Sequence, residues 1–574
     1  MKGLTGKVNS LTKLYKNHHN RLKVVLFFTI CFISVSFFKT LYIQLFTKQT
    51  IPIDKQAKVK GSRGAILDRN NNKLAYDIDF YDIELNIKGI TQEDISSARY
   101  FMKEYLDLNI SNLEGLVSGS HKDKIVLLEG VPYYIVDNLK NVFDKYPQIK
   151  KSPKYKGRYY PEKELASQLI GRFSHKKNSV GLWGIERSMN ESLKAHSDSL
   201  NFSITSRGHN RKNFSSDELE NLSGQDVVLT IDINYQRILE QELLRYLEKT
   251  NSSSANGIIV DPYSGEILAL ASVPSLDLNK PFSNDESTRD YVSRYSYEPG
   301  STLKTFSVLA GISNDVITLS EEYYCENGRY RIPNLKKRRI IQDHEGRDTL
   351  SVKEILAYSS NIGLVKMSAD IGERHIYNTF KSFGFGQKTG IDFYTDVSGE
   401  LKNLNQWNVH SLVSIPIGQE LRVTNLQIAM AYSAIANGGF LMQPKIVLDS
   451  PTQIVRKVAN RQDLDLLIES LKMTVSEGTA SYMKDESICS YGKTGTAQVF
   501  DVKNNQYSDS LFISSYAGVF PCEKPKLVCV VSFIGPDEDS KWASQSAVPA
   551  FSDILNRVVI KDNKLSMDIA YDTK

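Results

Sequence analysis

The strongest hydrophobic pattern in the chain is an uncharged run near its beginning. Val24–Phe38 contains no charged residue, and beyond Lys39 the apolar character continues to Phe46. About 20 apolar residues are needed to cross a bilayer, so residues 24–46 can span one if the Lys39 ammonium reaches the far headgroups. Because no Ala-x-Ala-like site follows the run, the pattern predicts an uncleaved transmembrane anchor rather than a signal peptide.

The charges that precede this run predict its orientation. Residues 1–23 contain only basic charges: Lys2, Lys7, Lys13, Lys16, Arg21 and Lys23. Positive flanking charge favours the cytoplasmic side, so we expect a cytoplasmic tail over residues 1–23 and a single pass through the cytoplasmic (inner) membrane. The net charge of +5 is largely due to this tail, and the rest of the chain lacks the basic bias of nucleic-acid-binding proteins.

Short strands, turns and helices alternate between the anchor and residue 222. Arg63–Asp77 combines alternating apolar positions with three asparagines at 70–72, which predicts a strand and a turn. Ile90–Leu108 has the periodicity and the start signal of a capped helix. We therefore expect an α+β scaffold domain over residues 47–222, without chemistry of its own.

A different pattern begins at residue 223. A strand that ends at Asp232 precedes an amphipathic helix, and Ala255–Ser275 reads as two strands around a turn. Phe512–Gly535 reads as two apolar strands joined by a short polar turn, which indicates antiparallel pairing. A mostly helical middle separates these strands. We predict one large α/β domain over residues 223–574, in which helices flank an antiparallel sheet built from sequence-distant strands.

The cysteines and histidines do not predict a metal site. The chain has no Cys-x-x-Cys and only nine histidines, so we expect neither a metal nor another cofactor. Four cysteines fall in the predicted exported region, where disulfides can form: Cys325, Cys489, Cys522 and Cys529. Cys522 and Cys529 flank the turn of the last predicted hairpin and are candidates for a pair, although the pairing among the four stays open.

Ser301 and Lys304 follow Pro299-Gly300 at the start of a predicted helix. Three residues make about one helical turn, so the hydroxyl and the amine share one face. A neighbouring amine can activate a serine if its pKa falls from about 10.4 toward the working pH. The spacing is not specific by itself, because the chain repeats it at Ser10/Lys13, Ser174/Lys177 and Ser481/Lys484.

Two later clusters give this pair its meaning. Ser359-Ser360-Asn361 supplies a hydroxyl and an amide two residues apart, and Lys493-Thr494-Gly495-Thr496 leads into a probable strand. Ser-x-x-Lys, Ser-x-Asn and Lys-Thr-Gly in this order are the signature of penicillin-binding proteins and class A β-lactamases. A second Lys-Thr-Gly, at Lys388–Gly390, follows a glycine-rich turn, and we assign it to a loop.

The first two clusters suit the nucleophilic half of acyl transfer. Ser301 is the predicted nucleophile, and either Lys304 or Ser359 can serve as the general base. Partial burial and the second cation at Lys493 can together lower the pKa of Lys304. Ser359 can relay a proton to the departing amine, and Asn361 can hold the substrate amide.

The third cluster suits substrate binding. Lys493, Thr494 and Thr496 can meet a substrate carboxylate. The backbone N–H groups of Ser301 and Thr496 can form an oxyanion hole, in which one donor is worth on the order of 100- to 1000-fold in rate. We interpret Gly495 as leaving room for a substrate along the strand edge.

Over roughly residues 22–540 the chain resembles the class B penicillin-binding proteins. "RGAILDRNNNKLA" is similar to the Arg-Gly-x-Ile-x-Asp-Arg-Asn-Gly signature of that family, with Asn71 where glycine is usual. Further similar segments follow in the expected order: "YYPEKELASQLIGRF", "GLWGIERSMN", "VVLTIDINYQ", "VDPYSGEILALASVPSLDLN" and "ANGGFLMQPKIV". The chain departs from the family at Glu420 and Leu421, where small residues are common, and after residue 545 it matches poorly.

The resemblance implies a membrane-anchored pedestal (a dimerisation-type domain) followed by a penicillin-binding D,D-transpeptidase fold. Ser301 would attack the D-Ala–D-Ala bond of a peptidoglycan stem peptide, and an amine of a neighbouring stem would accept the acyl group. β-Lactams mimic that dipeptide and would acylate Ser301. "YEPGSTLK" is most similar to the septal, cell-division branch, which implies divisome proteins and a SEDS-type glycosyltransferase as partners.

Several other functions use the same residues. A D,D-carboxypeptidase differs in accepting water, and an elongation-type transpeptidase differs in its place in the cell. A β-lactamase needs a helper glutamate that the sequence does not reveal. A non-catalytic scaffold or β-lactam sensor is disfavoured because Ser301, Lys304 and Lys493 are intact and 23 residues hold no signalling domain. A bifunctional class A enzyme is disfavoured because nothing before residue 224 resembles a glycosyltransferase.

Overall fold

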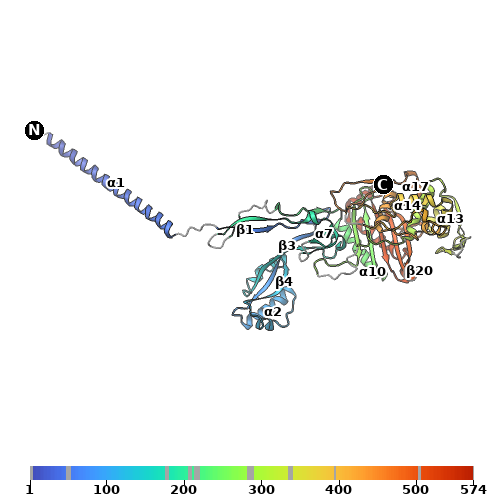
Figure 1. Ribbon diagram of the computed structural model, residues 1–574, viewed down its shortest axis with the longest axis horizontal. Helices are drawn as coiled ribbons and strands as arrows, with labels where there is room; N and C mark the ends of the chain where they lie inside the picture. Colours follow the sequence, from blue (N-terminus) through green and yellow to red (C-terminus); the bar gives the residue numbers. More distant parts are fainter. Residues whose placement is uncertain are drawn as a thin grey trace. The chain divides into compact units, whose positions relative to one another are not determined.

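The computed structural model describes residues 4–46, 53–174, 180–204, 210–212, 220–280, 290–333, 340–392, 396–501 and 506–572 (Figure 1). The chain forms two compact units. One consists of Met1–Gly61 and Ala195–Ser223, and the other consists of Ser62–Lys194 and Gly224–Lys574.

The first unit contains the predicted anchor. Helix α1 (Leu4–Phe46) includes an apolar segment of 29 residues, Asn17–Leu45. The most apolar part of this segment has a mean hydropathy of 2.2, and none of its residues is buried. At 1.5 Å per residue this segment is longer than the ~30 Å hydrocarbon core of a bilayer, so it is long and apolar enough to cross a membrane. Strands β1 (Ile53–Lys60), β8 (Ser197–Ile204) and β9 (Asn210–Lys212) form an antiparallel sheet in the order β1-β8-β9.

The second unit begins with a mixed sheet in the pedestal part of the chain. Its strands are β2 (Ile66–Leu67), β3 (Lys73–Asn86), β4 (Lys124–Pro132), β5 (Ile149–Tyr159) and β10 (Val227–Val228). They run in the order β10-β2-β3-β4, and β5 also pairs with β3. Short elements complete this part: α3 (Leu113–Ser118), α4 (Tyr133–Asn138), α5 (Lys140–Phe143), α6 (Ser167–Ile170), β6 (Phe173–Ser174), β7 (Val180–Gly181), α7 (Gly184–Ser188) and α8 (Asn190–Leu193).

Two local predictions in the pedestal are confirmed. Helix α2 (Gln92–Leu106) starts at Thr91, which forms a capping box with Asp94. The three asparagines form the turn between β2 and β3, where the Asp68 carboxylate accepts backbone hydrogen bonds from residues 70 and 72. Asn71 has a φ of 64°, a left-handed conformation that glycine adopts freely and asparagine tolerates. This explains why glycine is usual at this position of the signature.

The central sheet follows the predicted antiparallel plan. Among the described residues its order is β12 (Ile267–Val273), β11 (Ser254–Val260), β21 (Leu527–Ile534), β20 (Gln506–Phe520) and β19 (Tyr491–Asp501). Every residue of β11, β12 and β21 is buried, because helices cover both faces of the sheet. The predicted last hairpin is β20–β21, and β19 lies at the edge of the described sheet.

Helices pack on the two faces of this sheet. Helices α10 (Ile233–Lys249) and α18 (Ala547–Lys561) share one hydrophobic core with it. Helices α11 (Lys304–Ile312) and α16 (Asn425–Ala436) belong to the core on the other side. The segment after residue 545, which resembles the family poorly, is part of the folded domain. The Phe551 ring of α18 packs 4.8 Å from the Tyr516 ring of β20.

The remaining helices lie in the middle of the chain and at its end: α12 (Val352–Ala357), α13 (Asn361–Ile371), α14 (Glu373–Ser382), α15 (Ser411–Ser414), α17 (Arg461–Ser476) and α19 (Asn563–Asp572). Six short strands pair in twos, β13 with β16, β14 with β15 and β17 with β18. In chain order these strands are β13 (Glu322–Tyr324), β14 (Arg329–Arg331), β15 (Ile340–Gln342), β16 (Thr349–Ser351), β17 (Phe440–Met442) and β18 (Ile454–Lys457).

The candidate pair of Cys522 with Cys529 does not form. Cys522 is bonded to Cys489, not to Cys529, and the two Cα atoms of the bonded pair are 5.3 Å apart. The register explains the difference, because Cys529 lies opposite Gly518 within β21 and faces the buried core. Cys522 lies beyond the end of β20, where its backbone N–H donates to Cys489 O. Cys325 and Cys529 are free and buried.

Candidate active site

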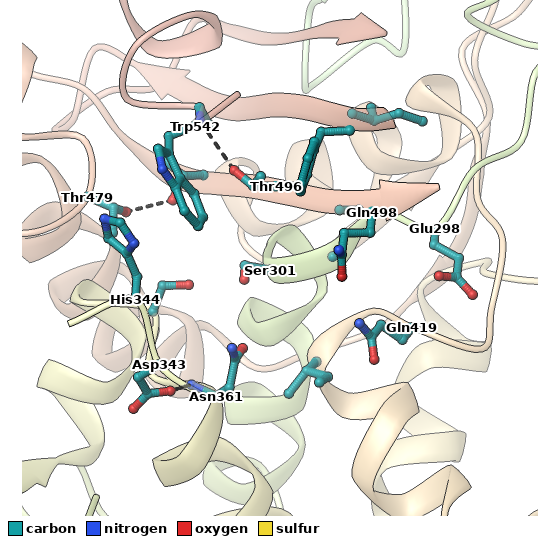
Figure 2. A pocket seen from close by; sticks show the side chains of 18 of the residues that line it. Glu298, Ser301, Asp343, His344, Asn361, Gln419, Thr479, Thr496, Gln498 and Trp542 are labelled. Atoms are coloured by element: carbon teal, nitrogen blue, oxygen red, sulfur yellow. Dashed lines mark hydrogen bonds between the residues drawn. The ribbon is translucent and has the colours of Figure 1, made fainter. Parts of the chain in front are cut away.

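Five of the eight predicted site residues line a cleft of about 1400 Å³ (Figure 2). Its walls include Ser301, Ser359, Asn361, Thr494 and Thr496, which come from all three motifs. One wall is the edge strand β19, and another is the junction of α12 and α13. The fold thus assembles residues that are almost 200 positions apart in the sequence.

Ser301 lies at the centre of this cleft. It belongs to a 3₁₀ turn, Gly300–Leu303, that leads directly into α11, so Lys304 follows one turn later as the sequence predicted. Gly300 has a φ of 56° and donates its N–H to Gly418 O at 3.1 Å. Ser301 faces the open space (Figure 2). Among the residues that the structure describes, no side chain forms a hydrogen bond with the Ser301 hydroxyl, which leaves it free for a ligand.

Lys304 is fully buried and makes three hydrogen bonds to the second motif. Its Nζ donates to Ser359 O at 2.6 Å, to Asn361 Oδ1 at 2.7 Å and to Ser359 Oγ at 3.3 Å. Burial lowers the pKa of Lys304 to about 7, against an opposing effect of the Asp343 carboxylate. The amine is therefore suited to accept a proton near neutral pH.

The second motif is held in a strained turn between two helices. Ser359 has a φ of 61°, which is unusual for a residue with a side chain. Ser360 caps α13 by accepting from Gly363 N at 3.0 Å, and Asn361 is the first residue of that helix. This geometry aims both the carbonyl and the hydroxyl of Ser359 at the Lys304 amine.

Lys493 lies beneath the cleft surface and is not part of its lining. It is fully buried, and its Nζ donates to Thr494 Oγ1 at 3.2 Å and Thr494 O at 3.3 Å. Burial, and then repulsion from Lys304, hold the pKa of Lys493 well below its usual value. Burial is also the cause of the low pKa of Lys304. Because both amines are buried and repel each other when charged, the state in which Lys304 and Lys493 are both protonated is disfavoured.

The threonines of β19 face the cleft. Thr494 Oγ1 is 2.6 Å from Thr479 Oγ1, and Thr496 Oγ1 accepts from Ala543 N at 3.2 Å (Figure 2). Both residues line the cleft wall. Successive residues of a strand point to opposite sides, so Lys493 and Gly495 lie on the other face of β19, where Gly495 meets the Ser301 turn.

The structure gives Gly495 a packing role that the sequence interpretation did not include. A Cβ atom at this position would lie 2.6 Å from Ser515 Oγ, 2.8 Å from Pro299 O and 2.9 Å from Thr302 Cγ2. These atoms belong to the neighbouring strand and to the turn that carries Ser301. Gly495 therefore allows the Ser301 turn to pack closely against β19.

Several cleft residues belong to no motif. Asp343 and His344 come from the segment after β15, and the His344 ring lies 4.2 Å from the Trp542 ring (Figure 2). Glu298 Oε1 accepts from Glu420 N at 2.9 Å, and burial raises the pKa of this carboxyl group. No spacing in the sequence marks these residues, since they reach the cleft only through the packing of distant segments.

The two departures from the family signature lie on the rim. Glu420 and Leu421 both line the cleft. Glu420 has a φ of 62°, and its carboxylate accepts from Lys402 Nζ at 2.6 Å and from Ser411 Oγ at 3.1 Å. This chain therefore places an ion pair at a position where small residues are common.

The second Lys-Thr-Gly lies in a loop, as predicted. Lys388 is exposed, and Thr389 donates through both its N–H and its hydroxyl to Asp396 Oδ2. None of the three residues lines the cleft. Within the described part of the chain, no group of three or more His, Cys, Asp and Glu side chains is arranged to hold a metal ion.

Comparison with known families and structures agrees with this geometry. Residues 256–556 match the penicillin binding protein transpeptidase domain, and residues 58–229 match the penicillin-binding protein dimerisation domain. The crystal structure of penicillin binding protein 3 from Mycobacterium tuberculosis, complexed with aztreonam, has the same fold. Its TM-score is 0.65 at 20% identity, over 88% of this chain and 97% of that chain.

Two curated relatives align along most of the chain. Stage V sporulation protein D of Bacillus subtilis is 26% identical over 512 residues, which cover 86% of this chain and 77% of that protein. The peptidoglycan D,D-transpeptidase FtsI homolog of Mesostigma viride is 26% identical over 538 residues, which cover 87% of each chain.

Proposed function

Since the chain belongs to the class B penicillin-binding proteins and carries their serine D,D-transpeptidase domain, we propose that it cross-links peptidoglycan during septal wall synthesis. The observation that carries the catalytic assignment is the cleft itself. A free serine hydroxyl, a buried lysine with a pKa of about 7 and an edge strand rich in donors meet in one space.

In the first half-reaction Ser301 Oγ attacks the carbonyl carbon of the D-Ala–D-Ala peptide bond. Lys304 Nζ, neutral in a large fraction of molecules near pH 7, takes the hydroxyl proton. The backbone N–H groups of Ser301 and Thr496 stabilise the negative oxygen of the tetrahedral intermediate. The C–N bond then breaks, and the departing amine receives a proton through Ser359. Free D-Ala is released, and the rest of the stem peptide remains bound to Ser301 as an ester.

In the second half-reaction an amine of a neighbouring stem peptide attacks this ester. The amine loses a proton to Lys304, a new amide bond forms, and the Ser301 oxygen leaves and is protonated again. Asn361 positions the substrate amide, while Thr494 and Thr496 bind the substrate carboxylate on the open face of β19. Burial, together with repulsion from Lys304, favours the neutral form of Lys493 beside this site. Gly495 contributes by letting the nucleophile approach that strand.

The proposed cellular role rests on the sequence resemblance and on the apolar helix α1. The "YEPGSTLK" resemblance favours the septal branch, with divisome proteins and a SEDS-type glycosyltransferase as partners of the anchor and the pedestal. The apolar helix α1 supports a single-pass protein whose tail is cytoplasmic and whose catalytic domain is extracytoplasmic. A fluorescent fusion that accumulates along the lateral wall and not at the septum would replace this role with the elongation-type alternative.

A covalent adduct tests the catalytic proposal. The full-length chain in detergent is incubated with a fluorescent penicillin, and its intact mass is measured beside Ser301→Ala and Ser313→Ala. Ser313 is an exposed serine at the other end of α11 and serves as the matched control. We expect one stable penicillin on the wild type and on Ser313→Ala, and none on Ser301→Ala. A folded wild-type protein without an adduct would refute the serine mechanism.

A second assay separates cross-linking from hydrolysis. A monomeric pentapeptide is supplied with and without an acceptor amine, and the products are separated by mass. Cross-linked dimer in the presence of the amine supports the transpeptidase. Release of D-Ala to water alone, with no dimer, would favour the D,D-carboxypeptidase.

A further inference from the structure

Asp343 is an acidic residue of the cleft wall that belongs to none of the three motifs. Its carboxylate lies at the first turn of α13, beside Asn361 (Figure 2). Oδ1 accepts from Asn361 N at 2.5 Å and from Ile362 N at 3.1 Å, and Oδ2 accepts from Ser360 Oγ at 2.5 Å. A carboxylate in this place satisfies N–H groups that a helix leaves without internal partners, and it complements the helix dipole.

The same segment fixes the orientation of the Asn361 side chain. Asn361 Nδ2 donates to Gln342 O at 2.8 Å, so its Oδ1 is turned the other way and accepts from Lys304 Nζ at 2.7 Å. A reversed amide would set its NH2 group against the lysine amine and its oxygen against a carbonyl, which loses both hydrogen bonds. Residues 342 and 343 together therefore hold both the backbone and the side chain of Asn361.

Ser359 depends on the same attachment. Its left-handed conformation costs energy and persists only where the surrounding structure enforces it. The next two residues are the ones that Asp343 binds, through Ser360 Oγ and Asn361 N. With that attachment in place, Ser359 O and Oγ both point at Lys304 Nζ.

We propose that Asp343 is a positioning residue for acylation, which places the oxygen atoms that orient the Lys304 amine toward its reaction. The inference rests on the proposed function. Asp343 acts through Ser360 and Asn361, to which it is hydrogen-bonded. It is also the negative charge that opposes the desolvation of Lys304 and raises its pKa.

The other titratable groups around this contact are few. Lys493 is the second buried cation, and its own pKa is lowered in part by Lys304. The Cys325 thiol lies behind Ser360, with its Sγ 3.6 Å from Ser360 Oγ, and burial raises the pKa of this thiol. Neither group supplies the negative charge that Asp343 provides.

Two substitutions separate the two effects of the Asp343 carboxylate. Asp343→Asn keeps an oxygen that can accept from Asn361 N but removes the charge, whereas Asp343→Ala removes both. Asp348→Asn, at an exposed position on the same segment, is the matched control. The second-order rate constant of labelling by a fluorescent penicillin is measured on the full-length chain from about pH 6 to 9, around the Lys304 pKa. Thermal unfolding reports whether each variant is folded.

We expect Asp343→Ala to lose on the order of 100-fold in labelling rate at the pH optimum. The oxygen atoms that accept hydrogen bonds from Lys304 Nζ would no longer be held in place by Asp343. In Asp343→Asn the acid limb of the profile should move to lower pH, because loss of the negative charge lowers the pKa of Lys304. A purely structural role would leave this limb in place. Asp348→Asn should match the wild type in both rate and profile.

An Asp343→Asn profile that coincides with the wild type overturns the proposal, whether or not Asp343→Ala folds. So does a folded Asp343→Ala that labels at the wild-type rate. A wild-type chain that is folded but never labels would instead refute the proposed function, so the two failures are distinguishable.

Discussion

A single methyl group at Gly495 should disturb the nucleophile more than it disturbs the fold. In Gly495→Ala the new Cβ would lie 2.6 to 2.9 Å from Ser515, Pro299 and Thr302. Thr302 is buried, and its hydroxyl donates to Pro299 O at 3.1 Å, so the turn is tied together and must move as a unit. Forcing a methyl group into a packed site costs about 1–3 kcal/mol.

The displaced turn is the one that carries Ser301. A shift of about 1 Å at a reacting atom can cost on the order of 100-fold in rate. Gly495→Ala should therefore lower both the thermal midpoint and the rate of penicillin acylation. Gly518→Ala on the adjacent strand β20 is the matched control, because its Cβ would come within 2.6 Å of Phe551 and Tyr516, on the side of α18. It should lose similar stability and keep its acylation rate.

The two variants are compared by thermal unfolding and by rapid-mixing labelling with a fluorescent penicillin, on full-length protein. A wild-type acylation rate in Gly495→Ala would refute the argument that this contact positions Ser301. Unchanged stability in Gly495→Ala would show that the methyl group faces open space, which favours the substrate interpretation. Equal losses of rate in both variants would show that acylation responds to general destabilisation.

Three further predictions concern the Lys304 amine and the disulfide bond. Acylation of the wild type should rise with pH and be half-maximal near pH 7, because Lys304 must be neutral to accept a proton. Unfolding measurements should show stability that rises between about pH 7 and 10.5, since unfolded Lys304 binds a proton there that the folded chain excludes. Reduction of Cys489–Cys522, which closes a separation of 33 residues, should cost about 3–4 kcal/mol of stability, measured as a fall in thermal midpoint with reductant and absent in Cys489→Ser.

Sequence reasoning succeeded where the cause is local. The anchor follows from the length of an uncharged run, and the start of α2 follows from Thr91 and Asp94, three residues apart. The β20–β21 hairpin follows from two apolar strands and the turn between them. Ser301 and Lys304 share a helical face because one turn separates them. In each case the residues that decide the structure are close neighbours in the chain.

Other features depend on which distant segments meet. The pairing of Cys489 with Cys522 and not with Cys529 depends on the strand register. The reason for Gly495 depends on a turn almost 200 residues earlier, which presses against β19. No pattern in the sequence marks such contacts.

The sequence by itself determined the long apolar helix, the three motifs that meet at the cleft and the α/β class, because hydrophobic length, helical spacing and strand periodicity are local properties. Only the tertiary structure decided how far the Lys304 pKa falls and which residue supports the second motif. Desolvation depends on every group that surrounds the amine, and Asp343 reaches α13 only through packing. Burial and charge are properties of the assembled cleft, so they become readable only after the chain has folded.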